Sequence, residues 1–379
     1  MSAGPSVDAA EIRAAALSAR QTPLVLEGVT VLGTLDLSAT KVPAIVFIEC
    51  RFAKELLLRG ASIDSLFVGG CEFPGLDARE VHIKADLQLC AKTRCAGSVR
   101  LEDARIDGNL SCNGALLEAP DNATIRADRA QIGGHLIMAN GFQTAGAVML
   151  PGIAVGGMLY CAHGRFINRA GVALALEGAA IAGNVILGNG FKAEGEVILR
   201  RARCGGELYC AHGSFENSGA NSLTAEGVSI RGRAFLGEWF AAKGTVSLRN
   251  GRIDGDLYCI GGIFQNAGGN AIDAAGLEVG GSVRMNKRFL AQGLVRLDAS
   301  RLGGSLNCTG GRFENRGAIA ISAAGITVGR DIVLGSGFRA DGIVRLDHAR
   351  ISGILDTEDA LCDELITEDV QTCSTATPG

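Results

Sequence analysis

The chain has 379 residues, of which 54 are glycine, 47% are apolar and only 5% are aromatic. Its 36 Lys and Arg and 40 Asp and Glu give a formal net charge of −4, and seven of the acids lie after residue 351. A nearly neutral body with an acidic end argues against a dedicated basic nucleic-acid binder and against a strong DNA mimic. The many small and aliphatic residues favour one elongated array over globular domains with aromatic cores.

Residues 1–21 are predicted to form an N-terminal capping helix. The segment 7–20 is alanine-rich and places Ile12 and Ala16 on one stripe. The helix is expected to cover the first coil of the array, because an uncovered β-edge invites pairing with other chains. The N-terminus has no secretory pattern, and no run reaches the ~20 apolar residues of a membrane-spanning helix. We therefore expect no membrane span and a cytoplasmic location.

Residues 22–356 repeat with a period of 49 residues. The valine of one strand recurs at Val99, Val148, Val197, Val246, Val295 and Val344. A phenylalanine next to a turn recurs at half this interval, alternately 24 and 25 residues apart, at Phe142, Phe166, Phe191, Phe215, Phe240, Phe264, Phe289, Phe313 and Phe338. The unit is therefore two coils, one with a GGxFxN turn and one with a GFxAxG turn.

This repeat predicts an all-β fold, a right-handed parallel β-helix (solenoid) of about fourteen coils. With coils stacked at the strand spacing of ~4.8 Å, the array would be about 65 Å long. Each coil would pair only with its neighbours, and we expect stacked valines and leucines to fill the interior without aromatic bulk.

The early coils are shorter, with spacings of 20 or 21 residues, and stretches such as LRGASIDSLFVGGCEF carry a five-residue rhythm. This part resembles the four-sided right-handed β-helix of the pentapeptide-repeat family and, more distantly, the solenoids of bactofilins. Sequences with a similar AxIxGxLxLxGAxF rhythm are often catalogued as membrane-associated oxidoreductases, but the chain has no cofactor motif to match.

Residues 357–379 are predicted to be an acidic C-terminal cap or tail. Ala360, Leu361, Leu365 and Ile366 have helical spacing, which predicts a short helix that closes the last coil. A tail that recruits a partner is the alternative interpretation.

The cysteines and histidines are interpreted as structural, and we expect no cofactor and no metal. Five cysteines recur every 49 residues, at Cys112, Cys161, Cys210, Cys259 and Cys308. Neighbours in this row would be two coils apart, roughly 10 Å, which is too far for a disulfide. We expect one interior line of reduced thiols. His163 and His212 are expected to be turn or surface residues, because the same separation prevents them from sharing a zinc ion.

Two polar series repeat with the same period. The first is a candidate basic stripe, interrupted by Ala154 and formed by Arg105, Arg203, Arg252, Arg301 and Arg350. It is either a solvated strand face with interleaved aspartates or a docking site for an acidic partner. The second series, Asn168, Asn217, Asn266 and Asn315, is expected to satisfy turn amides.

The repeat is broken most clearly at two GFxAxG turns. RAFLGEWFAA holds the only tryptophan, and MNKRFLAQG holds two cations. This candidate binding patch consists of Trp239, Phe240, Lys287, Arg288 and Phe289. Tryptophan is enriched in binding hot spots, although it also serves as packing at turns.

These observations favour a non-enzymatic scaffold that binds a macromolecular partner through one edge or its ends. We expect a protein partner, with self-association through the solenoid ends as a further possibility, and no nucleic acid, since exposed aromatic residues are scarce. The alternatives are a polymerising scaffold similar to bactofilins, a carbohydrate-active β-helix enzyme and a DNA-mimic inhibitor of the pentapeptide type. An enzyme of that kind would need clustered acids and aromatic subsites.

Overall fold

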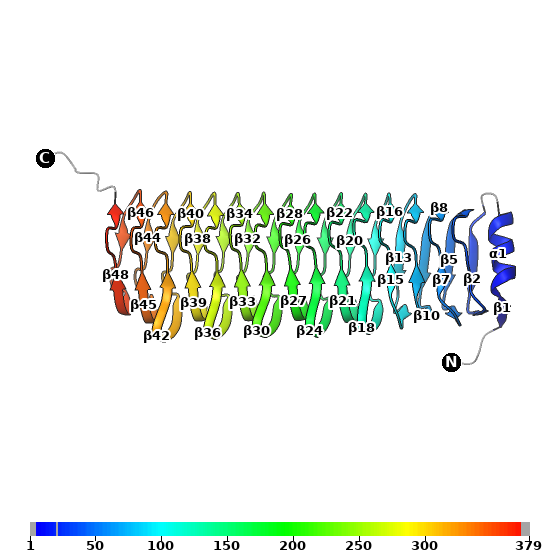
Figure 1. The fold of residues 1–379 in the computed structure, drawn as a ribbon, viewed down its shortest axis with the longest axis horizontal. Helices are drawn as coiled ribbons and strands as arrows, with labels where there is room; N and C mark the ends of the chain where they lie inside the picture. The colour runs from blue at the N-terminus through cyan, green and yellow to red at the C-terminus, as the bar shows by residue number, and fades with distance from the viewer. Residues whose placement is uncertain (1–4, 20–21, 373–379) are drawn as a thin grey trace. The chain divides into compact units, whose positions relative to one another are not determined.

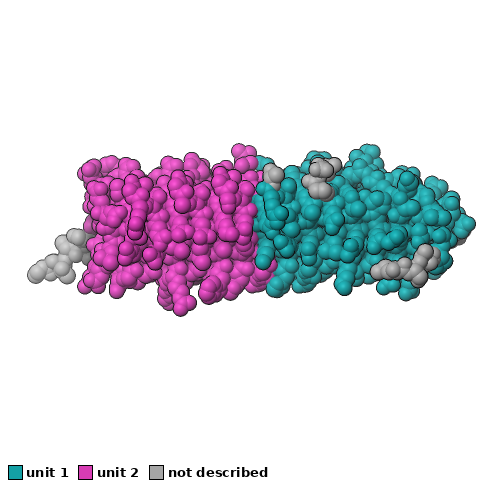
Figure 2. Space-filling model, turned by 90° about the horizontal axis from the view of Figure 1, so that it is seen from below, with its two compact units in different colours: residues 1–184, 192–195 teal, residues 185–191, 196–379 magenta. Residues whose placement is uncertain are grey.

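The protein is an all-β parallel solenoid of about 16 turns, as drawn in the computed structural model of Figure 1. The structure describes residues 5–19 and 22–372, apart from the side chains of residues 120–122 and 170. The chain divides into two compact units, coloured separately in Figure 2: Met1–Asn184 with Lys192–Gly195, and Val185–Phe191 with Glu196–Gly379. The predicted fold class is confirmed, with about two more turns than the predicted fourteen.

A helix, α1 (Ala9–Ser18), lies at the N-terminal end of the first unit (Figure 1). The carboxylate of Asp8 caps it by accepting a hydrogen bond from the Ala10 amide at 2.7 Å. Its stripe of Ala9, Ile12 and Ala16 is buried, and Arg13 Nε donates to the carbonyl oxygen of Asp36 at 2.9 Å. The helix therefore packs on the first turn as predicted; residues 1–4 and 20–21 of that segment lie outside the described residues.

Each turn crosses three faces, which we call A, B and C. In both units every strand pairs in parallel with its equivalent in the neighbouring turn, as Leu87 pairs with Leu66 and Leu110. In the first unit, face A holds β1 (Ser6–Asp8), β3 (Thr30–Leu32), β6 (Arg51–Phe52), β7 (Leu56–Leu57), β10 (Glu72–Phe73), β11 (Leu76–Asp77), β14 (Arg94–Cys95), β15 (Val99–Arg100), β18 (Leu116–Arg126), β21 (Gln143–Met149) and β24 (Arg165–Ala175). Face B of this unit holds β2 (Leu24–Glu27), β5 (Ile45–Ile48), β9 (Leu66–Gly69), β13 (Leu87–Cys90), β17 (Leu110–Ser111), β20 (Leu136–Ile137) and β23 (Leu159–Tyr160). Face C holds β4 (Lys41–Val42), β8 (Ser62–Ile63), β12 (His82–Ile83), β16 (Arg105–Ile106), β19 (Gln131–Ile132), β22 (Ala154–Val155) and β25 (Ala180–Ile181).

The second unit repeats the arrangement. Its face A holds β30 (Ser214–Thr224), β33 (Ala241–Ser247), β36 (Ile263–Asp273), β39 (Leu290–Arg296), β42 (Arg312–Ser322), β45 (Arg339–Arg345) and β48 (Leu361–Ile366). Face B holds β26 (Val185–Ile186), β29 (Leu208–Tyr209), β32 (Ala234–Phe235), β35 (Leu257–Tyr258), β38 (Val283–Arg284), β41 (Leu306–Asn307), β44 (Ile332–Val333) and β47 (Leu355–Asp356). Face C holds β28 (Arg203–Cys204), β31 (Ser229–Ile230), β34 (Arg252–Ile253), β37 (Glu278–Val279), β40 (Arg301–Leu302), β43 (Thr327–Val328), β46 (Arg350–Ile351) and β49 (Gln371–Thr372). One further strand of face A, β27 (Lys192–Ile198), contains residues of both units.

The two-coil repeat arises on face A, where strands of 11 and 7 residues alternate. The longer strands bulge outward, and in four of them an asparagine closes the bulge: Asn217 Nδ2 donates to the carbonyl oxygen of Asn221 at 2.7 Å. Equivalent bonds are made by Asn168, Asn266 and Asn315. The acceptor is a carbonyl and not the predicted turn amide. The next turn needs glycine, because a Cβ at Gly244 (φ 112°) would lie 2.4 Å from the Asn217 carbonyl oxygen.

The interior differs from the prediction because it is rich in phenylalanine. The repeating phenylalanines are fully buried, and their rings stack from turn to turn. In the second unit, successive ring centroids are 5.0 to 5.4 Å apart from Phe191 to Phe338. The expectation of a core without aromatic bulk was therefore wrong: the phenylalanines next to the turns point inward, where each tilted pair adds about 0.5–1.5 kcal/mol to simple burial.

The predicted C-terminal helix was also wrong. The segment forms one more turn, in which β48 pairs with β45 and β49 pairs with β46. Leu361 and Asp363 point outward, whereas Cys362 and Leu365 continue inward positions of the preceding turn, occupied there by Ala340 and Val344. Residues 373–379 of the predicted tail, with Cys373, lie outside the described residues.

The phenylalanine stack predicts a large difference between inward and outward aromatic residues. Phe264→Ala should lower the free energy of unfolding by about 3–5 kcal/mol, because it removes a buried ring between two others. The control is Phe235→Ala on the outer side of face B, which should cost only about 1 kcal/mol. Urea unfolding followed by circular dichroism measures both, and equal losses would contradict the stack.

Candidate functional site

The corner between faces B and A carries one two-residue turn in every second coil. In two of these turns, asparagine and then glycine adopt left-handed backbone angles: Asn140 (φ 50°) with Gly141 (φ 91°), and Asn189 (φ 49°) with Gly190 (φ 81°). This residue pair is the one that tolerates two positive φ angles in succession. The corner therefore favours asparagine and glycine, although other residues also occupy it.

Three of these turns place residues other than asparagine and glycine at both left-handed positions. One is in the first unit, with Ala91 (φ 53°) and Lys92 (φ 65°), and the other two are in the second unit. Glu238 (φ 48°) and Trp239 (φ 67°) replace the pair in one turn, and Lys287 (φ 46°) and Arg288 (φ 67°) replace it two coils further on. A left-handed conformation costs a residue with a Cβ about 1–2 kcal/mol. Left-handed angles recur at other exposed turns, such as Ala91 and Lys92, so these two turns are distinguished by the side chains they present.

The side chains on these turns are free to meet a partner. Trp239 is 66% exposed, and Lys287 and Arg288 are exposed without an ion-pair partner among the described residues. We call Trp239, Lys287 and Arg288 the basic–aromatic patch. The other two predicted members, Phe240 and Phe289, are fully buried in the phenylalanine stack and cannot contact a partner.

The intervening coil separates the two turns. The Glu238 amide donates to the Ile260 carbonyl oxygen at 2.6 Å, and the Lys287 amide donates to the Thr309 carbonyl oxygen at 3.1 Å. Gly261 lies between them and carries no side chain; a Cβ there would be 3.8 Å from the Lys287 carbonyl oxygen. The indole and the two cations therefore lie on either side of the Gly261 turn, which has no side chain there. Their backbones are roughly 10 Å apart.

An aromatic stack beside this corner was missed by the sequence reasoning. On the outer side of face B, the ring of Phe235 lies 5.6 Å from Tyr209 and 5.0 Å from Tyr258, the latter pair being parallel. The Arg233 guanidinium lies over the Phe235 ring at 5.2 Å, and that of Arg284 lies over the Tyr258 ring at 5.4 Å. Burial, and then the Glu238 carboxylate, raise the pKa of Tyr209. The stack mainly stabilises the sheet, because its ring faces are already occupied.

The cations of the stack differ from those of the patch because carboxylates neutralise them. Arg233 pairs with Glu207 at 2.6 Å, and Arg284 pairs with Asp256 at 3.3 Å. The unneutralised positive charge at this corner therefore comes from the basic–aromatic patch.

The predicted basic stripe lies on face C, where every member is exposed at the first position of its strand. In the first unit Arg105 pairs with Asp107 at 2.7 Å. In the second unit Arg252 and Arg301 share Glu278 at 3.2 and 3.3 Å, around a shallow hollow of about 310 Å³. Arg203 and Arg350 have no ion-pair partner among the described residues. The stripe is thus partly neutralised, which weakens it as a docking site.

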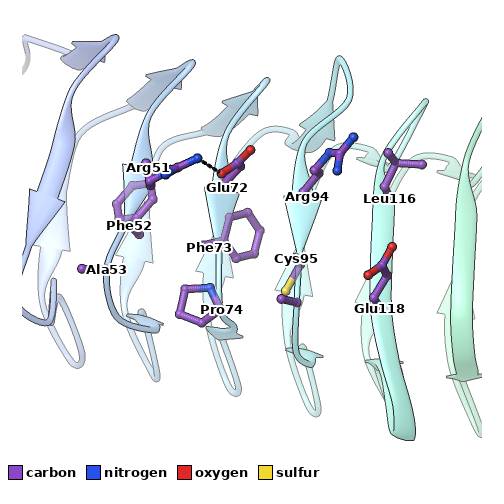
Figure 3. Close-up of a pocket in the computed structure, with 11 residues that line it drawn as sticks. Arg51, Phe52, Ala53, Glu72, Phe73, Pro74, Arg94, Cys95, Leu116 and Glu118 are labelled. Carbon is purple, nitrogen blue, oxygen red and sulfur yellow. Dashed lines mark hydrogen bonds and ion pairs between the residues drawn. The ribbon is translucent and has the colours of Figure 1, made fainter. Parts of the chain in front are cut away.

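The first unit contains a pocket of about 470 Å³ on face A (Figure 3). It forms where three short turns, with β6, β10 and β14, meet the first long strand, β18. Arg51 and Glu72 form an ion pair of 2.6 Å within it, whereas Arg94 and Glu118 are exposed. The sequence signal for this pocket was the change in coil length near Leu117, where the shorter early coils give way to the longer ones.

The cysteine row behaves as predicted. Cys112 and Cys161 in the first unit, and Cys210, Cys259 and Cys308 in the second, are buried free thiols. Burial raises their pKa values, that of Cys308 to about 12. His163 and His212 are exposed turn residues, as expected. In the part of the chain that the structure describes, no three His, Cys, Asp or Glu side chains are grouped to hold a metal ion.

Comparisons with known proteins found no relative: no protein family, no curated protein and no solved structure matches the chain. Among residues 5–19 and 22–372, no helix is long and apolar enough to span a membrane.

The thiol row predicts slow alkylation of the native protein. A thiol with a raised pKa stays protonated at pH 8, and the thiolate is the reactive form. Iodoacetamide at pH 8 should therefore leave Cys112, Cys161, Cys210, Cys259 and Cys308 unmodified in the native protein and modify them after unfolding, as measured by mass spectrometry. The half-buried Cys90 and Cys362 serve as internal controls that react sooner. Rapid native labelling of the interior row would contradict the assigned register.

Proposed function

We propose that the chain is a non-enzymatic scaffold that binds a protein partner through the basic–aromatic patch. The observation that carries this proposal is Trp239: it is 66% exposed and occupies, at φ 67°, a position that holds glycine in three equivalent turns, at Gly141, Gly190 and Gly337. A residue that costs stability and contributes no packing is best explained by binding. Tryptophan and arginine are also the residues that dominate protein–protein hot spots.

The surroundings of the patch support a protein partner over a nucleic acid. The exposed Glu238 lies beside Trp239 and offsets one of the two patch cations, whereas Glu207 and Asp256 are already paired. The positive charge that remains is too small for the row of phosphate contacts that a nucleic acid needs. The aromatic stack offers few free ring faces for bases. A partner with a few carboxylates and an apolar anchor matches the patch better.

Two further features accompany this proposal. A cytoplasmic location is supported by the free thiols of the described cysteines, because such thiols persist in a reducing compartment. A relation of the early turns to the pentapeptide-repeat solenoids is supported by their short repeat, since Ile45, Leu66 and Leu87 pair at intervals of 21 residues, and by the two short strands per turn on face A.

The proposal predicts opposite effects of one substitution on stability and binding. Trp239→Gly should raise the free energy of unfolding by about 1 kcal/mol, because glycine relieves the left-handed strain. The same change should abolish capture of the partner from an extract of the native host, as quantified by mass spectrometry.

Trp239→Ala is the matched control for this experiment. It keeps the strained backbone and removes the indole, so it should lose the partner without the gain in stability. Retention of the same captured protein by both variants would contradict a binding role for Trp239. A loss of stability in Trp239→Gly would contradict the strain argument.

A further inference from the structure

The last turn of the second unit carries a surface that is complementary to the basic–aromatic patch. On face A of this turn, Leu361 is 63% exposed, and Asp363 and Glu364 beside it are exposed without an ion-pair partner among the described residues. We call Leu361, Asp363 and Glu364 the acidic strip. It offers an apolar side chain next to two carboxylates, whereas the patch offers an indole next to two cations.

The acidic strip cannot reach the patch of its own molecule. Its residues are fixed in β48, whose Leu361 and Glu364 pair with Arg339 and Ile343 of β45. The patch lies on turns held in earlier coils of the same unit, where Trp239 and Arg288 precede β33 and β39. Because both surfaces are built into the solenoid, a contact between them requires two molecules.

We propose that the basic–aromatic patch of one molecule binds the acidic strip of a second copy of this chain. The inference rests on the proposed function, since it names the partner of the same patch. Leu361 would pack on the Trp239 indole, and Asp363 and Glu364 would pair with Lys287 and Arg288. The contact joins two different surfaces. Each molecule in an assembly can therefore bind one neighbour through its patch and another through its strip.

Complementary charge makes this contact selective. Two strips repel one another, as do two patches, so only the patch-to-strip arrangement is favourable. Exposed ion pairs are screened by salt, and the contact is therefore expected to weaken steeply with ionic strength.

The test is sedimentation of the full chain over a dilution series, at about 50 mM and about 500 mM salt. The wild type should self-associate at low salt. At high salt its dissociation constant should be at least about tenfold higher. Lys287→Glu/Arg288→Glu should be monomeric, and so should Asp363→Lys/Glu364→Lys. An equimolar mixture of the two variants should associate again, because each reversed surface then meets its complement.

Control variants separate this contact from general electrostatics and from misfolding. Arg203→Glu/Arg350→Glu makes the same change of charge on face C and should associate like the wild type. Trp239→Gly changes no charge and should weaken association. Circular dichroism and thermal unfolding should be the same for all of the charge variants, and recovery in the mixture shows that both reversed variants are folded.

A wild type that remains monomeric up to about 1 mM protein would overturn the inference, as would a mixture of reversed variants that does not associate. Association that survives both reversals would assign the contact to another surface and would also overturn it. The proposed function fails separately, when Trp239→Gly and Trp239→Ala capture the same host protein as the wild type.

Discussion

Parallel stacking of one turn on the next is the constraint on which the rest of the structure depends. Most strands on faces B and C are only two residues long. Each gains its stability from pairing with the same position above and below. Equivalent side chains meet at the strand spacing, which suits identical residues. The phenylalanine stack is the strongest expression of this rule, because each fully buried ring contacts the ring of the next turn at 5.0 to 5.4 Å in the second unit.

The same constraint determines how a site can arise. Stacking places every outward position in a row, so a substitution in one turn changes one place in a regular surface and leaves the fold intact. Trp239 and Arg288 are changes of this kind at positions that hold glycine in other turns, as at Gly141 and Gly190. The bulges on face A work differently, because Asn217 and Gly244 are required together by neighbouring turns. Variation is therefore tolerated at the corner between faces B and A and restricted on face A.

Much of the fold could be predicted because the period is visible in the residues themselves. The 49-residue interval identified two coils in each sequence repeat. It also identified the interior line of Cys210, Cys259 and Cys308. The orientation of the phenylalanines could not be predicted from the sequence, because a side chain beside a turn can point into the solenoid or out to solvent. In the last turn the register shift between Ala340 and Ile343 interrupts the alternation of strand residues, and the resulting pattern imitates a helix.

The candidate site was only partly visible in the sequence. The break in the repeat identified Trp239, Lys287 and Arg288, but not that Phe240 and Phe289 turn inward at the same corner. The outer aromatic stack escaped notice because Tyr209, Phe235 and Tyr258 are 26 and 23 residues apart, which does not match the spacing of 24 and 25 in the phenylalanine series. The acidic strip was not predicted, because the segment that contains it was expected to be a helix and not the strand β48.

The most direct test of the stacked register is a distance measured in solution between spin labels on face C of the second unit. Labels at Arg203→Cys and Arg301→Cys lie four turns apart, which predicts a narrow electron–electron distance near 20 Å, since neighbouring turns are separated by ~4.8 Å. Cys90, Cys362 and Cys373 are replaced by serine in this experiment, and the buried native thiols remain unlabelled under the same conditions. A broad distribution, or a mean distance beyond about 30 Å, would contradict the two-coil repeat and the surfaces built on it.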